Sequence, residues 1–190
     1  MSELIAITGG IGSGKSQVLH ALESAGEKVI SCDKITNELY NNRAVKRWLK
    51  KVFSESASGF FALKIDKKKI SSTVFGDKQK LKLLTDYLTP LILEKSLKRA
   101  KQLGGRVFVE VPLLFECNAQ NNFDKVVVIT RDLEDRILSV MARSNLTREQ
   151  VLERISSQFD YDNADLTPYH VIDNDSDISS LTQKALQLIK

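Results

Sequence analysis

Cysteine and histidine are scarce in this sequence, with two residues of each among 190. Cys32 and Cys117 follow no metal-binding spacing, so we interpret them as reduced thiols of a cytosolic protein. His20 and His170 are far apart in the sequence and form no ligand cluster. The sequence therefore predicts neither a disulfide framework nor a metal centre built from these residue types.

Long apolar runs are also absent. No run approaches the ~18 residues that a membrane-spanning helix needs. Residues 1–3 lead straight into the first predicted strand, which leaves no room for a signal or transit peptide. With 42% hydrophobic and 27% charged residues, the composition is that of an ordinary globular protein, and the length suits one domain with insertions. We expect a cytoplasmic protein without a membrane partner.

Positive charge is unevenly distributed, although the net charge is only +4. Seven lysines fall between Lys64 and Lys82, and further basic residues follow up to Arg106. Such a segment can attract an anionic metabolite, bind nucleic acid or form a solvated helix surface. The aromatic residues that stack on nucleic-acid bases are not interleaved with these lysines, and charge alone does not distinguish the alternatives.

The chain is organised around a glycine-rich stretch, Thr8–Ser16, with the spacing G-x-x-x-x-G-K-[ST]. The apolar run Leu4–Ile7 before it predicts a buried strand. Apolar residues at helical spacing over Val18–Leu22 predict a helix that begins near Gly14 or Lys15. Strand before and helix after is the setting in which this spacing indicates a phosphate-binding loop rather than an ordinary turn.

The residue types of this stretch suit a nucleotide polyphosphate. Glycines let consecutive backbone N–H groups surround an anion, and the helix start adds unpaired N–H groups. Lys15 supplies a mobile charge for the β- and γ-phosphates, and the Ser16 hydroxyl is placed to hold Mg²⁺. The predicted nucleotide-binding residues are Gly10, Ile11, Gly12, Ser13, Gly14, Lys15 and Ser16.

Two further predicted strands end in acidic residues. Asp33 follows the strand Lys28–Ser31, at the sheet edge where parallel α/β proteins bind ligands. There it can accept a proton from an attacking hydroxyl or hold the metal's water, or it can cap the helix that follows, and these interpretations are compatible. Glu110, in the strand Val107–Val111, resembles a Walker B carboxylate; the alternative is a partner for a nearby lysine.

An apolar stretch follows that strand and either lines an acceptor pocket or plugs the sheet edge. The predicted substrate-binding residues are Thr8, Asp33, Glu110, Pro112, Leu113, Leu114 and Phe115.

Residues 34–103 contain no convincing strand, and we interpret them as a helical acceptor-binding insertion. Ser54–Phe61 is expected to be a loop and Lys67–Phe75 a short helix. A long helical pattern runs from Asp77 to Leu103, and Pro90 is expected to kink it or divide it in two.

The C-terminal third predicts two strands and three helices. Asp132 begins a helix that ends near Arg143, and Thr147 with Gln150 forms a capping box for the next helix. An arginine on a closing segment can neutralise transition-state charge, and Arg143 is our first candidate for that role. The other predicted elements are strands over Lys125–Thr130 and Tyr169–Asn174 and a closing helix over residues 178–189.

Seven segments, spread in order over nearly the whole chain, together resemble the dephospho-CoA kinases. They are Thr8–Ser16, Val29–Asp33, Pro90–Ile92, Val111–Glu116, Met141–Arg143, Arg154–Gln158 and Val171–Asn174. The resemblance implies an α/β fold, a P-loop NTPase of three α/β/α layers with a five-stranded parallel sheet. It also implies a core over residues 1–33, 104–135 and 168–190, a helical CoA-binding insertion over 34–103 and a helical lid over 136–167.

The resemblance also implies a reaction. ATP with Mg²⁺ would phosphorylate the ribose 3′-hydroxyl of dephospho-CoA, the last step of coenzyme A synthesis. Lys15 would bind the ATP phosphates, Asp33 would be the base, and Arg143 would be the lid arginine near the transferred phosphate. The sequence departs from the family pattern at Ser31, Thr89, Glu110, Ser139 and Pro168–Tyr169. It also departs at residues 159–162, where the family usually has a basic stretch.

Two other functions stay open at this stage. One is a small-molecule P-loop kinase with a nucleotide or a shikimate-like acceptor. The other is an NTP-dependent switch whose basic face binds nucleic acid. The apolar strip at Leu113–Phe115 and the arginines of the predicted lid favour a kinase. We expect no nucleic-acid partner and a monomer or weak homo-oligomer.

Overall fold

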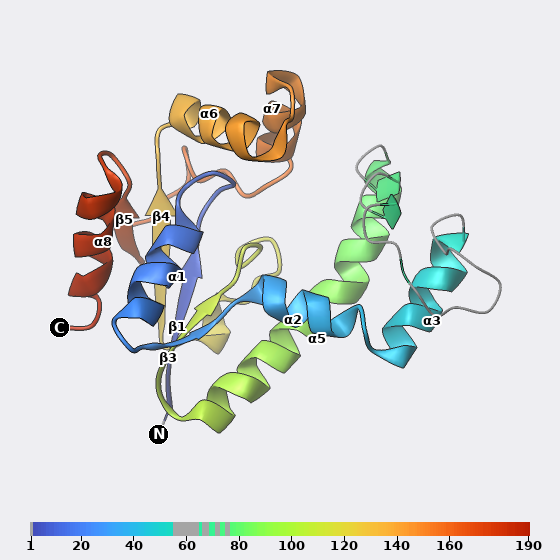
Figure 1. Ribbon diagram of the computed structural model, residues 1–190, viewed down its shortest axis with the longest axis horizontal. Helices are drawn as coiled ribbons and strands as arrows, with labels where there is room; N and C mark the ends of the chain where they lie inside the picture. The colour runs from blue at the N-terminus through green and yellow to red at the C-terminus, as the bar shows by residue number, and fades with distance from the viewer. Residues whose placement is uncertain (1, 55–64, 66–68, 71–72, 75–76) are drawn as a thin grey trace. The chain divides into compact units, whose positions relative to one another are not determined.

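The computed structural model describes residues 2–54, 65, 69–70, 73–74 and 77–190 (Figure 1). The chain forms two compact units. We call Met1–Ser31 with Arg99–Lys190 the sheet unit, and Cys32–Lys98 the helical unit. In the described part of the chain, no helix is long and apolar enough to cross a membrane.

The sheet unit is built on five parallel strands in the order β2-β3-β1-β4-β5. Their bounds are β1 Ser2–Thr8, β2 Lys28–Ile30, β3 Gly105–Glu110, β4 Lys125–Thr130 and β5 His170–Asp173. The central strands are nearly continuous apolar runs, as strands covered on both faces must be. The predicted fold class, α/β with a five-stranded parallel sheet, is confirmed.

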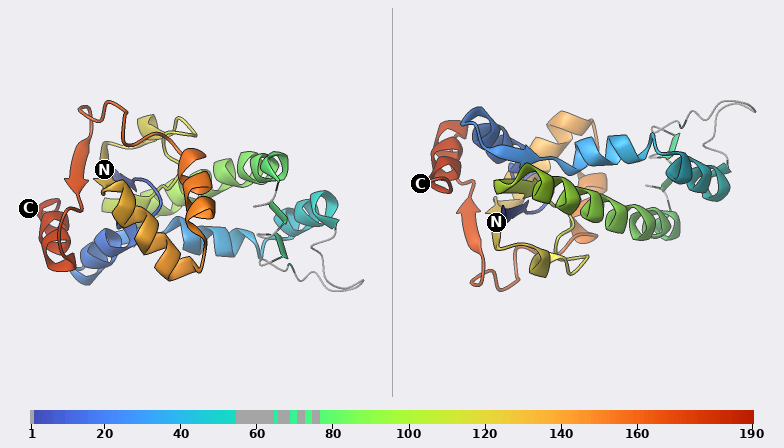
Figure 2. Two further views of the ribbon diagram at one scale, coloured as in Figure 1. Left: turned by 90° about the horizontal axis from the view of Figure 1, so that it is seen from above. Right: turned by 90° about the horizontal axis from the view of Figure 1, so that it is seen from below.

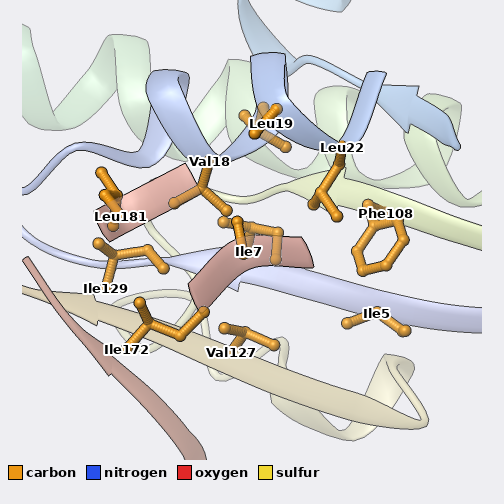
Figure 3. Packing of buried hydrophobic residues seen from close by; sticks show 12 residues of the cluster. Ile5, Ile7, Val18, Leu19, Leu22, Phe108, Val127, Ile129, Ile172 and Leu181 are labelled. Atoms are coloured by element: carbon orange, nitrogen blue, oxygen red, sulfur yellow. The ribbon is translucent and has the colours of Figure 1, made fainter. Parts of the chain in front are cut away.

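One face of this sheet is covered by α1 (Lys15–Ser24) and α8 (Ile178–Gln187), which lie side by side (Figure 2). Leu22 of α1 and Leu181 of α8 pack on Ile7, Phe108 and other buried strand residues (Figure 3). Burying each such side chain contributes about 1.5–3 kcal/mol. Because α1 starts directly after the glycine-rich loop, this packing also fixes the loop's second end.

Two further helices of the sheet unit form a small hairpin with its own core. In α6 (Leu133–Ser144), the side chain of Asp132 caps the first turn, and in α7 (Arg148–Ser156), Thr147 and Gln150 form the predicted capping box. Ile137, Val140 and Val151 are buried between the helices, and Ile11 of the glycine-rich loop packs against them. Both predicted helix starts are confirmed. A short 3₁₀ helix, η2, spans Gln120–Asn122.

The helical unit contains α2 (Cys32–Leu39), α3 (Arg43–Val52) and most of α5 (Lys78–Leu103), whose last residues belong to the sheet unit. Pro90 lies inside α5 and does not divide it, so that alternative was wrong. Trp48 of α3 stacks on Tyr87 of α5 with ring centroids 3.8 Å apart, which joins the two helices. The loop predicted at 54–61 and the helix predicted at 67–75 lie largely outside the described residues.

Candidate active site in the sheet unit

The glycine-rich loop between β1 and α1 needs glycine for steric reasons at its two ends. Gly9 has a φ of +144°, and a Cβ there would lie 2.3 Å from the Ile129 carbonyl oxygen. Gly14 has a φ of +107°, and a Cβ there would lie 2.7 Å from Asn174 Nδ2. Both the conformation and the close neighbours exclude a side chain. The loop is therefore packed tightly between β4 and the residue that follows β5.

Lys15 bends back over the loop that precedes it. Its Nζ donates hydrogen bonds to the carbonyl oxygens of Gly9, at 2.7 Å, and Gly10, at 2.8 Å. Burial lowers its pKa from 10.5 to about 8; Glu110 and Glu116 act in the opposite direction, and Arg143 and Arg136 add to the lowering. A cation held at the mouth of this loop can bind a polyphosphate.

This pKa predicts how nucleotide binding depends on pH. Free Lys15 loses its proton as the pH rises past about 8, whereas a bound polyphosphate favours the charged form. The affinity for ATP should therefore fall above pH 8, by up to about tenfold per pH unit. Calorimetric titration with magnesium-free ATP between pH 7 and 9.5 measures this. A Lys15→Arg variant keeps its charge and should give a flat profile; a slope of equal size there would assign the effect to another group.

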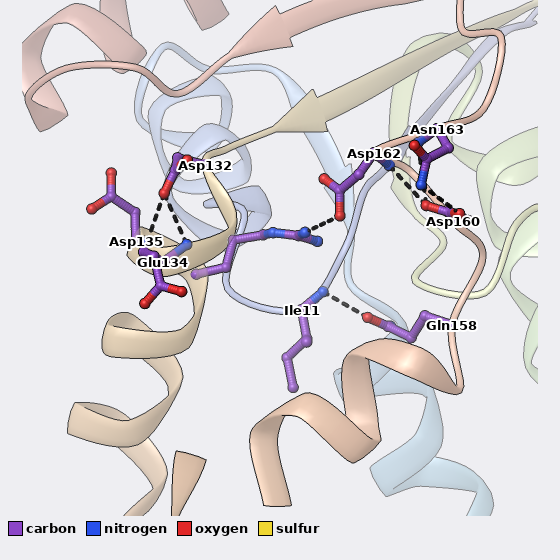
Figure 4. A network of polar contacts seen from close by, with 9 residues as sticks. Ile11, Asp132, Glu134, Asp135, Gln158, Asp160, Asp162 and Asn163 are labelled. Carbon is purple, nitrogen blue, oxygen red and sulfur yellow. Dashed lines mark hydrogen bonds and ion pairs between the residues drawn. The ribbon is translucent and has the colours of Figure 1, made fainter. Parts of the chain in front are cut away.

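The segment Gln158–Asp162 is attached to the glycine-rich loop. Gln158 Oε1 accepts a hydrogen bond of 2.8 Å from the Ile11 N–H (Figure 4). The hydroxyl groups of Tyr161 and Thr8 are 3.1 Å apart, and burial raises the pKa of Tyr161 to about 12, so the phenol stays protonated. Glu116, after β3, accepts a hydrogen bond from the Phe159 N–H at 2.8 Å.

Asn174, just after β5, supports the loop from the other side. Its buried side chain donates a hydrogen bond of 2.9 Å from Nδ2 to the carbonyl oxygen of Ser13, and its N–H donates to the Thr130 carbonyl. Ser13 is itself 1% exposed. A single residue, through its side chain and its backbone N–H, therefore joins the ends of β4 and β5 to the middle of the loop.

Replacing Asn174 by alanine should lower the free energy of unfolding by about 1–3 kcal/mol, because the buried Ser13 carbonyl loses its partner. Urea titration of wild type and variant measures the difference. Asn41→Ala is the matched control, since Asn41 lies just after α2 and its side chain donates an exposed hydrogen bond to the Asn37 carbonyl of that helix, and it should change stability by less than about 0.5 kcal/mol. Equal effects of the two substitutions would contradict a special role for Asn174.

Glu110 ends β3 and is 6% exposed. Its Oε2 accepts a hydrogen bond of 2.8 Å from the hydroxyl of Ser31, which follows the neighbouring strand β2. Glu110 also acts electrostatically on Lys15. The position is compatible with both interpretations of Glu110, a Walker B carboxylate and a partner for a lysine, because its carboxylate lies near Lys15 and at the carboxyl edge of the sheet.

The predicted substrate residues after β3 have different surroundings. Leu114 is fully buried, which favours a plug at the sheet edge over a pocket lining. Phe115 packs in an aromatic cluster with Phe159, Tyr161 and Tyr169, at centroid distances of 4.5 to 5.9 Å. Pro112 and Leu113 are half-buried.

The two other predicted catalytic residues are exposed. Arg143 lies in the last turn of α6, and its positive charge contributes to the lowered pKa of Lys15. Asp33 belongs to the helical unit and lies in the first turn of α2. Because that helix begins at Cys32, the interpretation of Asp33 as its cap was wrong.

Comparison with known proteins identifies the family. The family model for dephospho-CoA kinase matches residues 3–180. The chain belongs to the dephospho-CoA kinase family. A curated dephospho-CoA kinase of Helicobacter pylori is 31% identical over 196 aligned positions, which cover 100% of this chain and 97% of that protein.

Solved structures of two similar proteins match the fold over nearly the whole chain. The crystal structure of a Thermus thermophilus protein has a TM-score of 0.82 and 31% identity, and covers 99% of this chain and 96% of that one. The dephospho-CoA kinase from Campylobacter jejuni has a TM-score of 0.71 and 30% identity, and covers 100% of this chain and 96% of that one.

Some residues at the site of this family member were not predicted to have a role. They include Gln158, Tyr161 and Asn174, which contact the loop from more than 140 positions away. Gln158 and Asn174 lie in segments that carry the family resemblance, and that position was the available signal. Tyr161 carried no such signal, because it lies where the family pattern is basic.

Proposed function

We propose that the chain transfers the γ-phosphate of ATP to the ribose 3′-hydroxyl of dephospho-CoA, giving coenzyme A and ADP. The observation that carries the proposal is the family match over residues 3–180 of a chain whose Lys15 starts α1 directly after the loop. The hydroxyl oxygen attacks the γ-phosphorus, the bond to the β–γ bridging oxygen breaks, and ADP leaves with that oxygen.

The residue roles follow from charge and position. N–H groups of the loop and the Lys15 ammonium bind the β- and γ-phosphates. Arg143, whose charge already reaches Lys15, stabilises the charge that develops on the transferred group. Asp33, which follows β2 in the chain, accepts the proton of the attacking hydroxyl. Pro112 and Leu113 contact the acceptor.

The donor set at the loop fits Mg²⁺ bound together with ATP. Ser16 offers an exposed hydroxyl at the start of α1, and the described residues contain no cluster of three or more acidic, histidine or cysteine side chains that could hold a metal by itself. Mg²⁺ usually takes one or two protein ligands and obtains the rest from phosphates and water. When bound, the ion neutralises phosphate charge. We further propose a cytoplasmic monomer or weak homo-oligomer that binds neither nucleic acid nor membranes.

A coupled ADP-release assay with purified protein and Mg-ATP tests this function. Dephospho-CoA is compared with AMP, adenosine, shikimate and a blank without acceptor. We expect ADP release that requires dephospho-CoA, with a product one phosphate heavier by mass spectrometry.

Other outcomes have distinct meanings. Release that requires a different acceptor would keep the phosphotransferase and discard the substrate. Release without any acceptor, or none at all, would favour an NTP-dependent switch, and nucleic-acid titration across a range of salt concentrations would then test that alternative.

A further inference from the structure

Arg136, in α6, is a charged residue that is only 3% exposed. Burying a charge is costly unless it is paired. Its Nη2 donates to Asp162 Oδ2 at 2.5 Å, and the Asp162 side chain is 49% exposed. Asp162 comes from the segment attached to the loop (Figure 4). The arginine is thus fixed from outside by a carboxylate that water still reaches.

Arg136 touches the glycine-rich loop at two points. A Cβ at Gly12 would lie 2.7 Å from the Arg136 carbonyl oxygen and 3.0 Å from its Cα. A Cβ at Gly10 would lie 2.5 Å from Arg136 Nη1. The backbone of Arg136 therefore lies against Gly12, and its guanidinium lies against Gly10.

The contact at Gly10 is informative because the backbone there does not require glycine. Gly12 has a φ of +80°, whereas the φ of Gly10 lies outside the left-handed region. An alanine at position 10 would meet no backbone strain of that kind. The guanidinium is the group that it would displace, so the loop and Arg136 are fitted to each other.

A small cavity joins Arg136 to a third point of the loop. In the described part of the chain, the buried atoms Ser13 Oγ and Arg136 Nε have no hydrogen-bond partner. Both residues line a cavity of about 10 Å³, together with Tyr161 and Asp162. This is roughly the space of one water molecule, which could hydrogen-bond to both atoms.

We propose that Arg136 is a further positioning residue for the reaction: Asp162 holds its guanidinium against Gly10 and so fixes the loop that binds the ATP phosphates. With 3% of its surface exposed, Arg136 acts through the loop and does not touch the nucleotide. The inference rests on the proposed use of ATP and adds a residue to that site.

The first test is Arg136→Gln, with Arg136→Lys beside it. Misplacement of a phosphate by about 1 Å can cost up to about 100-fold, so we expect kcat/KM for ATP to fall about 10- to 100-fold in Arg136→Gln. The KM for dephospho-CoA should stay within about twofold. Arg136→Lys, which keeps the charge but not the planar fork, should lie between the two. The matched control is Arg106→Gln, because Arg106 also pairs with a carboxylate, that of Glu27, but lies at the start of β3, at the end of the sheet away from the loop, and its activity should equal that of wild type.

A double-mutant cycle tests the contact itself and does not depend on whether Arg136→Gln folds well. Gly10→Ala should weaken ATP binding about tenfold in the wild-type background, because its Cβ displaces the guanidinium. In an Arg136→Ala background the same substitution should change ATP affinity less than about twofold. Binding is measured by calorimetry with ATP and without acceptor, and a urea titration confirms that each variant is folded.

Two results would overturn the proposal. One is a loss for Gly10→Ala that is equally large in both backgrounds, and the other is unchanged ATP affinity and kcat/KM in folded Arg136→Gln. Neither result bears on whether wild type phosphorylates dephospho-CoA. If wild type lacks that activity, the proposed function fails, and the calorimetric cycle still decides the role of Arg136.

Discussion

Lys15→Met is expected to lower kcat/KM for ATP by about 10²- to 10³-fold, the usual cost of removing one group that stabilises transition-state charge. The ammonium is hydrogen-bonded to the loop at Gly9 and Gly10, where a polyphosphate would bind. Methionine keeps much of the side-chain length but carries no charge. The coupled ADP-release assay with varied ATP measures the effect.

The control for this prediction is a lysine of the same unit that makes a surface ion pair. Lys125 pairs with Glu3 and its side chain is 66% exposed, so Lys125→Met should keep wild-type kinetics. The stability of Lys15→Met should be close to that of wild type, because the loss of two hydrogen bonds to the buried residues Gly9 and Gly10 is offset by the removal of a largely buried charge. Wild-type kcat/KM in folded Lys15→Met would remove the lysine from the mechanism.

Local sequence patterns predicted many of the strands and helices, because the residues that determine each of these elements are close together in the chain. The predicted strand Lys125–Thr130, five of whose six residues are β-branched, forms β4 over the same residues. The capping box of Thr147 and Gln150 places the start of α7, because both of its hydrogen bonds lie within one turn. In the same way, the apolar run Leu4–Ile7 predicted β1, and the helical spacing over Val18–Leu22 predicted α1, on either side of the glycine-rich loop.

Contacts between distant segments could not be predicted from such patterns. Tyr161 meets Thr8 across 153 positions, and Asn174 meets Ser13 across 161. No periodicity encodes which residues meet at the loop once the strands have been ordered. The sequence pattern of α6 gives no sign that Arg136 is buried, because its burial depends on Asp162 and on the approach of α6 to Gly10 and Gly12.

The departure from the family pattern at residues 159–162 can be explained by the contacts that these residues make. Where a basic stretch is usual, residues 159–162 here supply aromatic rings to the cluster around Phe115 and a carboxylate to Arg136. The positive charge near this side of the loop comes instead from Arg136 and Arg143 of α6. The segment therefore acts as a support for the loop, and the division of the chain into core, insertion and lid stays a prediction.

Asp33→Asn is expected to lower kcat by about 10²- to 10⁴-fold, the range in which a positioned general base contributes. The amide keeps the size of the carboxylate but does not accept the proton of the attacking hydroxyl. Asp33 is exposed in the first turn of α2, so the substitution should leave the fold intact. ATP affinity, measured by calorimetry without acceptor, should change less than about threefold, since the loop and Lys15 are untouched.

A large fall in kcat with nearly unchanged ATP affinity would show that Asp33→Asn impairs catalysis and not folding. Asp86→Asn is the matched control, because Asp86 is an exposed aspartate of the helical unit that pairs with Lys82 one turn away, and its kcat should equal that of wild type. Asp33→Glu keeps the charge but moves it by one methylene, so it should recover part of the rate. Near-normal turnover in Asp33→Asn would show that another group accepts the proton, and Glu110, which acts electrostatically on Lys15, would be the next carboxylate to replace.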